Sequence, residues 1–261
     1  MSRIIDAFYR DDYSTLYLGD AFRLLPLMEE ESIDVIFADP PYFLSNNGIS
    51  CSGGRQVSVN KGYWDEGFTS EEKHDFNLNW LSLCRRLLKP NGTIWVSGTL
   101  HNIFSVGMAL EQLEFKILNN ITWQKTNPPP NLACRCFTHS TETILWAKKS
   151  RTAKHCFNYA LMKKMNGNKQ MKDVWTGSLT PLSEKRFGKH PTQKPLYLLE
   201  RILLASTRVG DIVLDPFCGS STTGVVAKKL GCRYIGIDFN REYLELSLER
   251  LKNECAISTT G

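Results

Sequence analysis

Residues 211–238, DIVLDPFCGSSTTGVVAKKLGCRYIGID, contain a complete β-α-β unit. Two apolar runs in it are typical of buried parallel strands, and they end in Asp215 and Asp238. A turn of small residues, 216–224, separates the first strand from a helix that Gly231 closes. In open α/β sheets, ligands bind outside the carboxyl ends of the strands. The unit therefore predicts a ligand site formed by this turn and the two acids.

The turn does not match the common nucleotide-binding signatures. A P-loop ends in Gly-Lys-Ser or Gly-Lys-Thr, and a dinucleotide turn reads GxGxxG, whereas residues 219–224 read GSSTTG. Glycine lets the backbone approach a ligand, and Asp238 can bind both hydroxyls of a ribose. A nucleoside with a cationic sulfonium and an amino acid tail, such as S-adenosylmethionine, suits this site, with Asp215 near its ammonium group. The structural alternative is that Asp215 only caps the strand end.

A second strand end carries the motif Asp39-Pro40-Pro41-Tyr42, directly after the apolar run 33–38. Two prolines fix φ and carry no amide hydrogen, so their carbonyls are acceptors on a stiff loop. A carboxylate, rigid carbonyls and an aromatic ring suit a planar base, because the acceptors bind its NH2 group and the ring stacks on it. The motif predicts a site for a flipped-out adenine or cytosine. The alternative is an ordinary strand-end turn with an incidental tyrosine.

Strands and helices alternate along the remainder of the chain. Further strands are predicted at 15–20, 93–97, 115–123 and 141–146, and further helices at 21–28, from 69–72 to a turn at 89–92, and at 103–113, 196–206 and 242–252. This order predicts an α/β fold with a Rossmann-like, mostly parallel central sheet. The long polar segment 45–61 is expected to be a functional flap.

Positive charge is concentrated in one part of the chain. The whole chain has a formal charge of +5, yet residues 125–194 hold fourteen Lys and Arg against three acids, so the remainder is net acidic. Such segregation predicts contact with a polyanion, and aromatic residues among the basic ones fit an insertion that reads nucleic acid. The alternative is an irregular subdomain whose aromatic residues form a small core.

The cysteine pattern and the hydropathy of the chain predict its cellular compartment. Eight cysteines are scattered without a CxxC pair, so we expect free thiols in a reducing compartment and no metal site. No apolar run is long enough to span a membrane, and the amino-terminal residues lack the apolar region of a signal peptide. We therefore expect a cytoplasmic protein.

Three motifs in order resemble the β-class amino-methyltransferases of DNA. They are DPPY at 39–42, HPTQKP at 190–195 and DPFCGSSTTG at 215–224. In that class the catalytic motif precedes the cofactor motif, a circular permutation of the usual methyltransferase order, and the resemblance covers nearly the whole chain. Segments 38–45, 118–127 and 172–178 are most similar to the DpnA-type adenine methyltransferases that act on GATC.

The resemblance implies an organisation and an activity. Residues 1–126 would form the catalytic half, 127–189 a target-recognition insertion and 190–261 the cofactor-binding half. The implied reaction is transfer of a methyl group from S-adenosylmethionine to N6 of adenine in DNA, by base flipping and direct transfer, in restriction and modification. A homodimer and a companion restriction endonuclease are compatible with it.

The resemblance also implies roles for single residues. Asp39 and the Pro40 carbonyl would hold the amine in the stiff loop with Pro41, and Tyr42 would stack on the base. The implied cofactor-binding residues are Asp20 at the adenine, Asp238 at the ribose, Phe217, Cys218 and Gly219 along the cofactor and Lys194 near its methionine part, together with Asp215, Ser221 and Thr222. Ser221 departs from the usual glycine, so either the loop stays at negative φ or cofactor affinity suffers.

Four other functions compete with this interpretation, three enzymatic and one limited to DNA binding. A cytosine-N4 methyltransferase usually carries serine in place of Asp39, and a catalytically inactive DNA-binding relative would have Ser221 as its lesion. A nucleotide-dependent oxidoreductase needs the missing dinucleotide turn. A glutamine methyltransferase acting on proteins usually has asparagine at the position of Asp39 and the opposite motif order. The sequence leaves open the exact recognition sequence and the preference for single- or double-stranded DNA.

Overall fold

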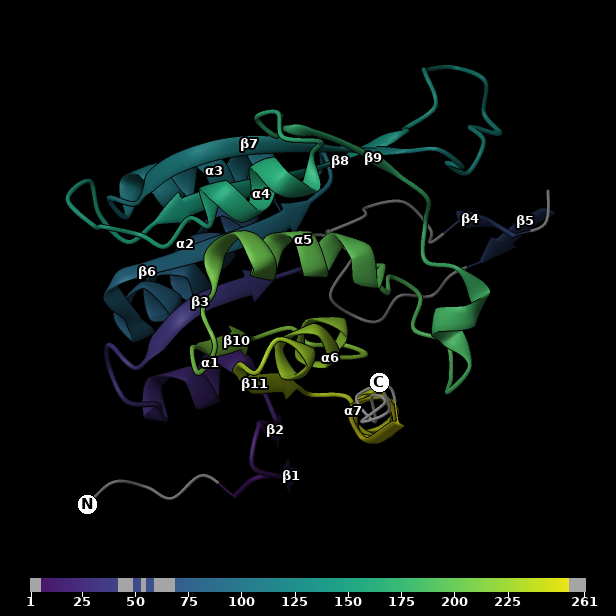
Figure 1. Ribbon diagram of the computed structural model, residues 1–261. Helices are drawn as coiled ribbons and strands as arrows, with labels where there is room; N and C mark the ends of the chain where they lie inside the picture. The colour runs from purple at the N-terminus through teal and green to yellow at the C-terminus, as the bar shows by residue number, and fades with distance from the viewer. Residues whose placement is uncertain (1–5, 42–48, 53–54, 59–68, 254–261) are drawn as a thin grey trace.

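The main sheet has nine strands in the order β1-β2-β11-β10-β3-β6-β8-β7-β9 (Figure 1). The computed structural model describes residues 6–41, 49–52, 55–58 and 69–253. The strands of the sheet are β1 (Tyr9–Arg10), β2 (Ser14–Leu18), β3 (Ile33–Ala38), β6 (Leu88–Gly98), β7 (Lys116–Lys125), β8 (Thr141–Lys148), β9 (Val174–Gly177), β10 (Ile212–Asp215) and β11 (Arg233–Asp238). Every strand except β1 and β8 runs in the same direction, so the predicted mostly parallel sheet is confirmed.

Helices cover both faces of the sheet (Figure 1). One face is covered by α1 (Ala21–Leu24), α2 (Ser70–Leu87) and α3 (Ile103–Gln112), and the other by α4 (Tyr159–Met165), α5 (Leu196–Ser206), α6 (Thr222–Lys229) and α7 (Arg241–Asn253). Strand β3 is buried on both sides, because Val35 and Phe37 enter one core cluster while Ile36 and Ala38 enter the other. A strand of this kind needs apolar residues at every position, which explains the unbroken apolar run before Asp39.

The last β-α-β unit inserts its strands among the first strands of the chain. β10 pairs in parallel with β3, and β11 pairs in parallel with β2. The pairing of Leu214 with Ile36 brings Asp215 and Asp39 to neighbouring strand ends. Two motifs far apart in sequence therefore meet at one edge of the sheet.

Two predicted elements differ from the structure in kind, and the ends of several others are shifted by one to three residues. The helix expected at 21–28 stops at Leu24 and continues as a 3-10 turn, Leu25–Leu27, because Pro26 cannot donate to an α-helical ladder. The turn expected at 89–92 is part of β6. There the Lys89 ammonium lies 2.7 Å from the Asp34 carboxylate, and a register shift between Ile33 and Val35 accommodates the extra residues beside β3.

Two segments with functional predictions contain regular structure. The expected flap includes an antiparallel pair, β4 (Ile49–Ser52) and β5 (Arg55–Ser58), and its other residues lie outside the described part of the chain. Residues 127–189 add β8 and β9 to the main sheet and place α4 against α5. Among the described residues, no helix has the length and apolar character needed to cross a bilayer.

Candidate active site

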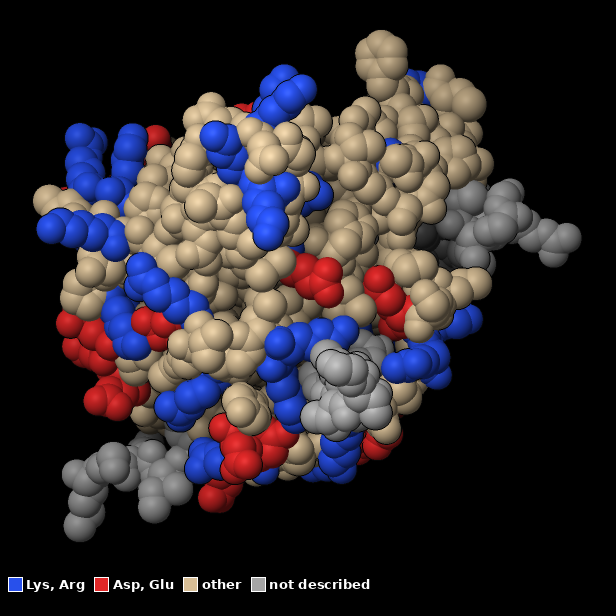
Figure 2. Space-filling model, viewed as in Figure 1, with Lys and Arg blue, Asp and Glu red and all other residues tan. Residues whose placement is uncertain are grey.

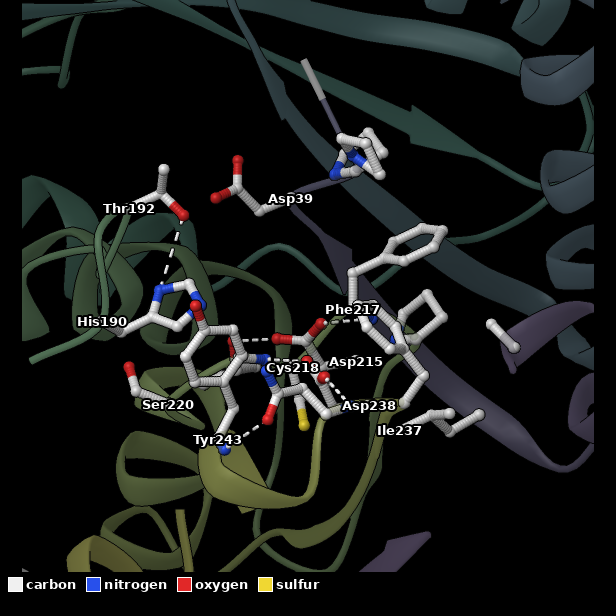
Figure 3. Close-up of a pocket in the computed structure, with 18 of the residues that line it drawn as sticks. Asp39, His190, Thr192, Asp215, Phe217, Cys218, Ser220, Ile237, Asp238 and Tyr243 are labelled. Carbon is white, nitrogen blue, oxygen red and sulfur yellow. Dashed lines mark hydrogen bonds between the residues drawn. The ribbon is translucent and has the colours of Figure 1, made fainter. Parts of the chain in front are cut away.

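A cavity of about 640 Å³ opens where β2, β3, β10 and β11 end (Figure 3). The predicted site residues that line it are Asp20, Asp39, Pro40, Pro41, Lys194, Asp215, Phe217, Cys218, Gly219, Thr222 and Asp238. Tyr42 lies outside the described residues. Ser221 is fully buried and is absent from the lining, which makes it the one described residue of the predicted set that faces away from the cavity. The structure thus brings the two motifs together in one pocket.

The two strand-end acids are buried and organise the turn between them. Asp215 accepts hydrogen bonds from the Phe217 amide at 3.1 Å and the Thr223 hydroxyl at 2.7 Å. Asp238 accepts the Gly219 amide at 2.9 Å. Burial raises the pKa of Asp215 to about 7 and the pKa of Asp238 to about 6. Asp215 therefore caps the strand end, as the structural alternative predicted, and it also lines the cavity.

The turn after β10 requires two residues in the left-handed region. Gly219 has a φ of +50°, and a β-carbon there would lie 2.9 Å from Nε2 of His190. Ser221 has a φ of +51° and a ψ of +40°, so the first of the two alternatives for this serine, a loop at negative φ, is wrong. The Ser221 hydroxyl accepts a hydrogen bond from the buried Tyr234 hydroxyl at 3.1 Å, which gives the serine a structural role that glycine lacks.

His190 and Tyr243 form a wall of the cavity that the site prediction missed (Figure 3). Their rings meet edge to face with centroids 4.3 Å apart. Burial and the nearby charge of Lys194 lower the pKa of His190 to about 4, so the imidazole is neutral near pH 7. The HPTQKP motif pointed to His190, whereas Tyr243 follows the second acid by five residues and carried no recognisable signal.

Aromatic rings line another side of the cavity. Phe22 meets Phe76 with ring centroids 5.1 Å apart, and Phe217 meets Trp80 at 5.5 Å. Phe22, Phe76 and Phe217 all belong to the cavity wall. Flat apolar surfaces of this kind suit a planar heterocycle. Asp20 caps α1 through the Phe22 amide at 2.9 Å, so the simple helix-cap role that the sequence left open is also present.

Asp39 is paired with a lysine. Nζ of Lys194 lies 2.7 Å from Oδ2 of Asp39 and 3.4 Å from Oε2 of Glu142. The Pro41 carbonyl accepts a hydrogen bond from the Asn102 side chain at 3.3 Å, so this acceptor of the stiff loop is engaged within the protein. Burial raises the pKa of Cys218 well above its usual value, which keeps this thiol protonated.

Comparisons with known proteins identify the family. The model of the N6/N4 DNA methylase family matches residues 33–249. The chain belongs to this DNA methylase family. The methylase is 65% identical over 248 residues to the type II methyltransferase M2.DpnII of Streptococcus pneumoniae, covering 95% of this chain and 92% of that protein. It is 51% identical over 260 residues to M2.MboI of Moraxella bovis, covering 97% and 95% of the two chains.

Solved structures show the same fold. The M1.HpyAVI–SAM complex matches with a TM-score of 0.67 and 30% identity, over 91% of the methylase and 98% of that chain. The PvuII cytosine-N4-specific DNA methyltransferase matches with a TM-score of 0.75 and 20% identity, over 98% and 90%, which supports the fold alone. The predicted family, fold class and DNA methyltransferase activity are confirmed. The roles of single site residues stay predictions.

Proposed function

We propose that the methylase transfers a methyl group from S-adenosylmethionine to N6 of adenine in DNA, within the sequence GATC. The observation that carries the proposal is that Asp39 and the turn after β10 line one cavity. The motif resemblance supports adenine, because the cytosine-N4 enzymes of this family usually carry serine at the position of Asp39. The resemblance of segments 38–45, 118–127 and 172–178 to the DpnA-type methyltransferases supports GATC, and the chain is similar to the type II methyltransferases M2.DpnII and M2.MboI over nearly its whole length.

The cavity suits S-adenosylmethionine by the chemistry of its walls. The cofactor is a nucleoside with cationic sulfonium and ammonium groups. Two buried carboxylates with raised pKa values, Asp215 and Asp238, favour a cationic ligand, because such a ligand stabilises their ionised forms. The wall formed by Phe22, Phe76 and Phe217 suits the adenine ring. The neutral His190 adds no positive charge that would repel a sulfonium.

The remaining chemistry belongs to the loop after β3. S-adenosylmethionine supplies an electrophilic methyl group when it is bound. The lone pair of an aromatic amine is delocalised into the ring, so the amine is a poor nucleophile. Hydrogen bonds from the amine to Asp39 and the Pro40 carbonyl would localise this lone pair and stabilise the positive charge that develops on nitrogen. Lys194 holds the Asp39 carboxylate in place through their ion pair.

DNA contacts are assigned to the basic segment 127–189. Figure 2 shows lysine and arginine side chains at the upper centre of the molecule, over α4, which contains Lys163 and Lys164. These charges would offset the cost of flipping a base, on the order of a few kcal/mol. We also propose that the insertion spans residues 127–189 and that the methylase is cytoplasmic. A homodimer and a companion restriction endonuclease are proposed with it.

The proposal is tested with defined oligonucleotides, single- and double-stranded, with and without GATC. We expect N6-methyladenine after digestion to nucleosides, and only from substrates that contain GATC. The Asp39→Ala variant should lose transfer while retaining S-adenosylmethionine binding in calorimetry. N4-methylcytosine in the digest would establish the rival activity, and a wild-type chain that does not bind the cofactor would indicate an inactive DNA-binding relative. Full activity of Asp39→Ala would refute the assigned site.

A further inference from the structure

Four largely buried charged side chains form an alternating row from the loop after β3 to the end of the β7–β8 hairpin where its loop begins. In order they are Asp39, Lys194, Glu142 and Lys125, with side-chain exposed fractions between 7% and 13%. Lys194 precedes α5, Glu142 lies near the start of β8 and Lys125 ends β7. The row therefore connects three separate parts of the chain, and Glu142 occupies the position between the two ammonium groups.

The contacts along the row are unequal. Lys125 lies 2.6 Å from Oε1 of Glu142, whereas Lys194 lies 3.4 Å from Oε2 and only 2.7 Å from Asp39. Oε2 of Glu142 is buried and accepts no hydrogen bond from the described residues. Burial alone would raise the pKa of Glu142, but the charges of Lys194 and Lys125 outweigh it and the pKa is lowered. Glu142 is thus an ionised carboxylate with one oxygen 2.6 Å from Lys125 and the other in a longer, 3.4 Å contact with Lys194.

We propose that Glu142 is a positioning residue that receives the Lys194 ammonium when the target amine binds to Asp39. A base that donates its amine hydrogens to Asp39 competes with Lys194 for the same carboxylate. A displacement of less than about 1 Å would bring Nζ from 3.4 Å to the usual ion-pair distance of about 2.8 Å from Oε2. The ammonium then keeps a full partner, and Asp39 gains capacity for the amine without a buried charge being left unpaired.

This inference rests on the proposed function, since it assumes that Asp39 binds the reacting amine. Lys125 orients the Glu142 carboxylate. Its 2.6 Å contact to Oε1 fixes the carboxylate and leaves Oε2 directed at Lys194. A purely structural Glu142 would only neutralise two buried lysines. The two roles differ in what they predict for the methyl-transfer rate of a folded variant.

The test compares single-turnover methylation by Glu142→Gln, Glu142→Asp and the wild type on a GATC duplex. Glutamine retains the shape and an acceptor but removes the charge, so we expect the rate to fall roughly tenfold to a hundredfold. The dissociation constants for DNA and S-adenosylmethionine should change less than about threefold. Aspartate retains the charge and should recover part of the rate. Asp11→Asn is a matched control, since Asp11 pairs with Lys228 at 2.7 Å away from the cavity and its loss should leave the rate unchanged.

A double-mutant cycle with Lys194→Met separates the two roles. If Glu142 acts through Lys194, adding Glu142→Gln to Lys194→Met should slow transfer by less than about twofold further. A wild-type rate for Glu142→Gln, effects that multiply in the cycle, or a loss confined to DNA affinity would each overturn the inference. If Glu142→Gln does not fold, a wild-type rate for Glu142→Asp overturns it and a slowed rate supports it. If the wild type forms no N6-methyladenine, the proposed function itself fails. That result is separate from any effect of the Glu142 variants on the transfer rate.

Discussion

Replacement of Ser221 separates backbone strain from a buried hydrogen bond. Ser221 adopts the left-handed conformation, with φ +51° and ψ +40°, which costs a residue with a β-carbon about 1–2 kcal/mol. Its hydroxyl accepts from Tyr234, and removal of a partner from a buried hydroxyl costs about 1–3 kcal/mol. Ser221→Ala retains the strain and loses the hydroxyl, so the free energy of unfolding should fall by about 1–3 kcal/mol. Ser221→Gly also loses the hydroxyl but relieves the strain.

The informative quantity is the difference between these two variants. Glycine is less restricted in the unfolded chain, which costs about 0.4–1 kcal/mol, so the net advantage of glycine over alanine should be about 1 kcal/mol. Urea denaturation of both variants measures it. Because Ser221 does not line the cavity, the dissociation constant for S-adenosylmethionine should change less than about threefold in either variant. If Ser221→Ala is as stable as Ser221→Gly, the strain argument is wrong.

Three further perturbations test the cavity and its supports. Cofactor affinity should rise by about a hundredfold between pH 5.5 and 7.5 in calorimetry, because Asp215 and Asp238 have raised pKa values and must lose protons to hold a cation, and Asp215→Asn should flatten this dependence. Gly224→Ala should lower the free energy of unfolding by about 1–3 kcal/mol in urea, since its β-carbon would overlap the Tyr234 ring; an unchanged midpoint would contradict the packing. Arg250→Met removes a buried guanidinium that donates to Ser220 and Thr222 in the turn after β10, and should both lower the free energy of unfolding by about 2–3 kcal/mol and weaken cofactor binding. Lower stability with an unchanged affinity for S-adenosylmethionine would show that the turn keeps its binding conformation without Arg250.

Local patterns predicted the elements that carry the motifs. The run before Asp39 is apolar at each position because β3 is buried on both faces, and α5 begins and ends where its periodicity predicts, at Leu196 and Ser206. The same reasoning placed Asp215 and Asp238 at strand ends, where the structure has them. These features depend on neighbours in sequence, so a single chain is enough to show them.

Features that depend on distant contacts were not predictable in the same way. Tyr243 meets His190 across 53 positions of sequence, and Glu142 meets Lys194 across 52. No local pattern marks such pairs. The count of Lys and Arg in residues 125–194 takes no account of burial. Lys125 and Lys194 are largely buried and pair with Glu142, so their charges are already paired within the protein. Charge counted along a chain therefore overstates the charge that is available to DNA.

The pairing of β10 with β3 explains how a permuted chain can build a shared site. Asp39 and Asp215 are 176 positions apart, yet parallel pairing aligns the carboxyl ends of their strands. The order of the motifs along the chain is then irrelevant to the cavity, because each motif needs only its own strand end. What the order does affect is the connection: residues 127–189 lie in the chain between β3 and β10, and Lys194, just beyond this segment, contacts Asp39. The segment proposed to bind DNA is thus joined directly to a residue that holds the carboxylate proposed to bind the base.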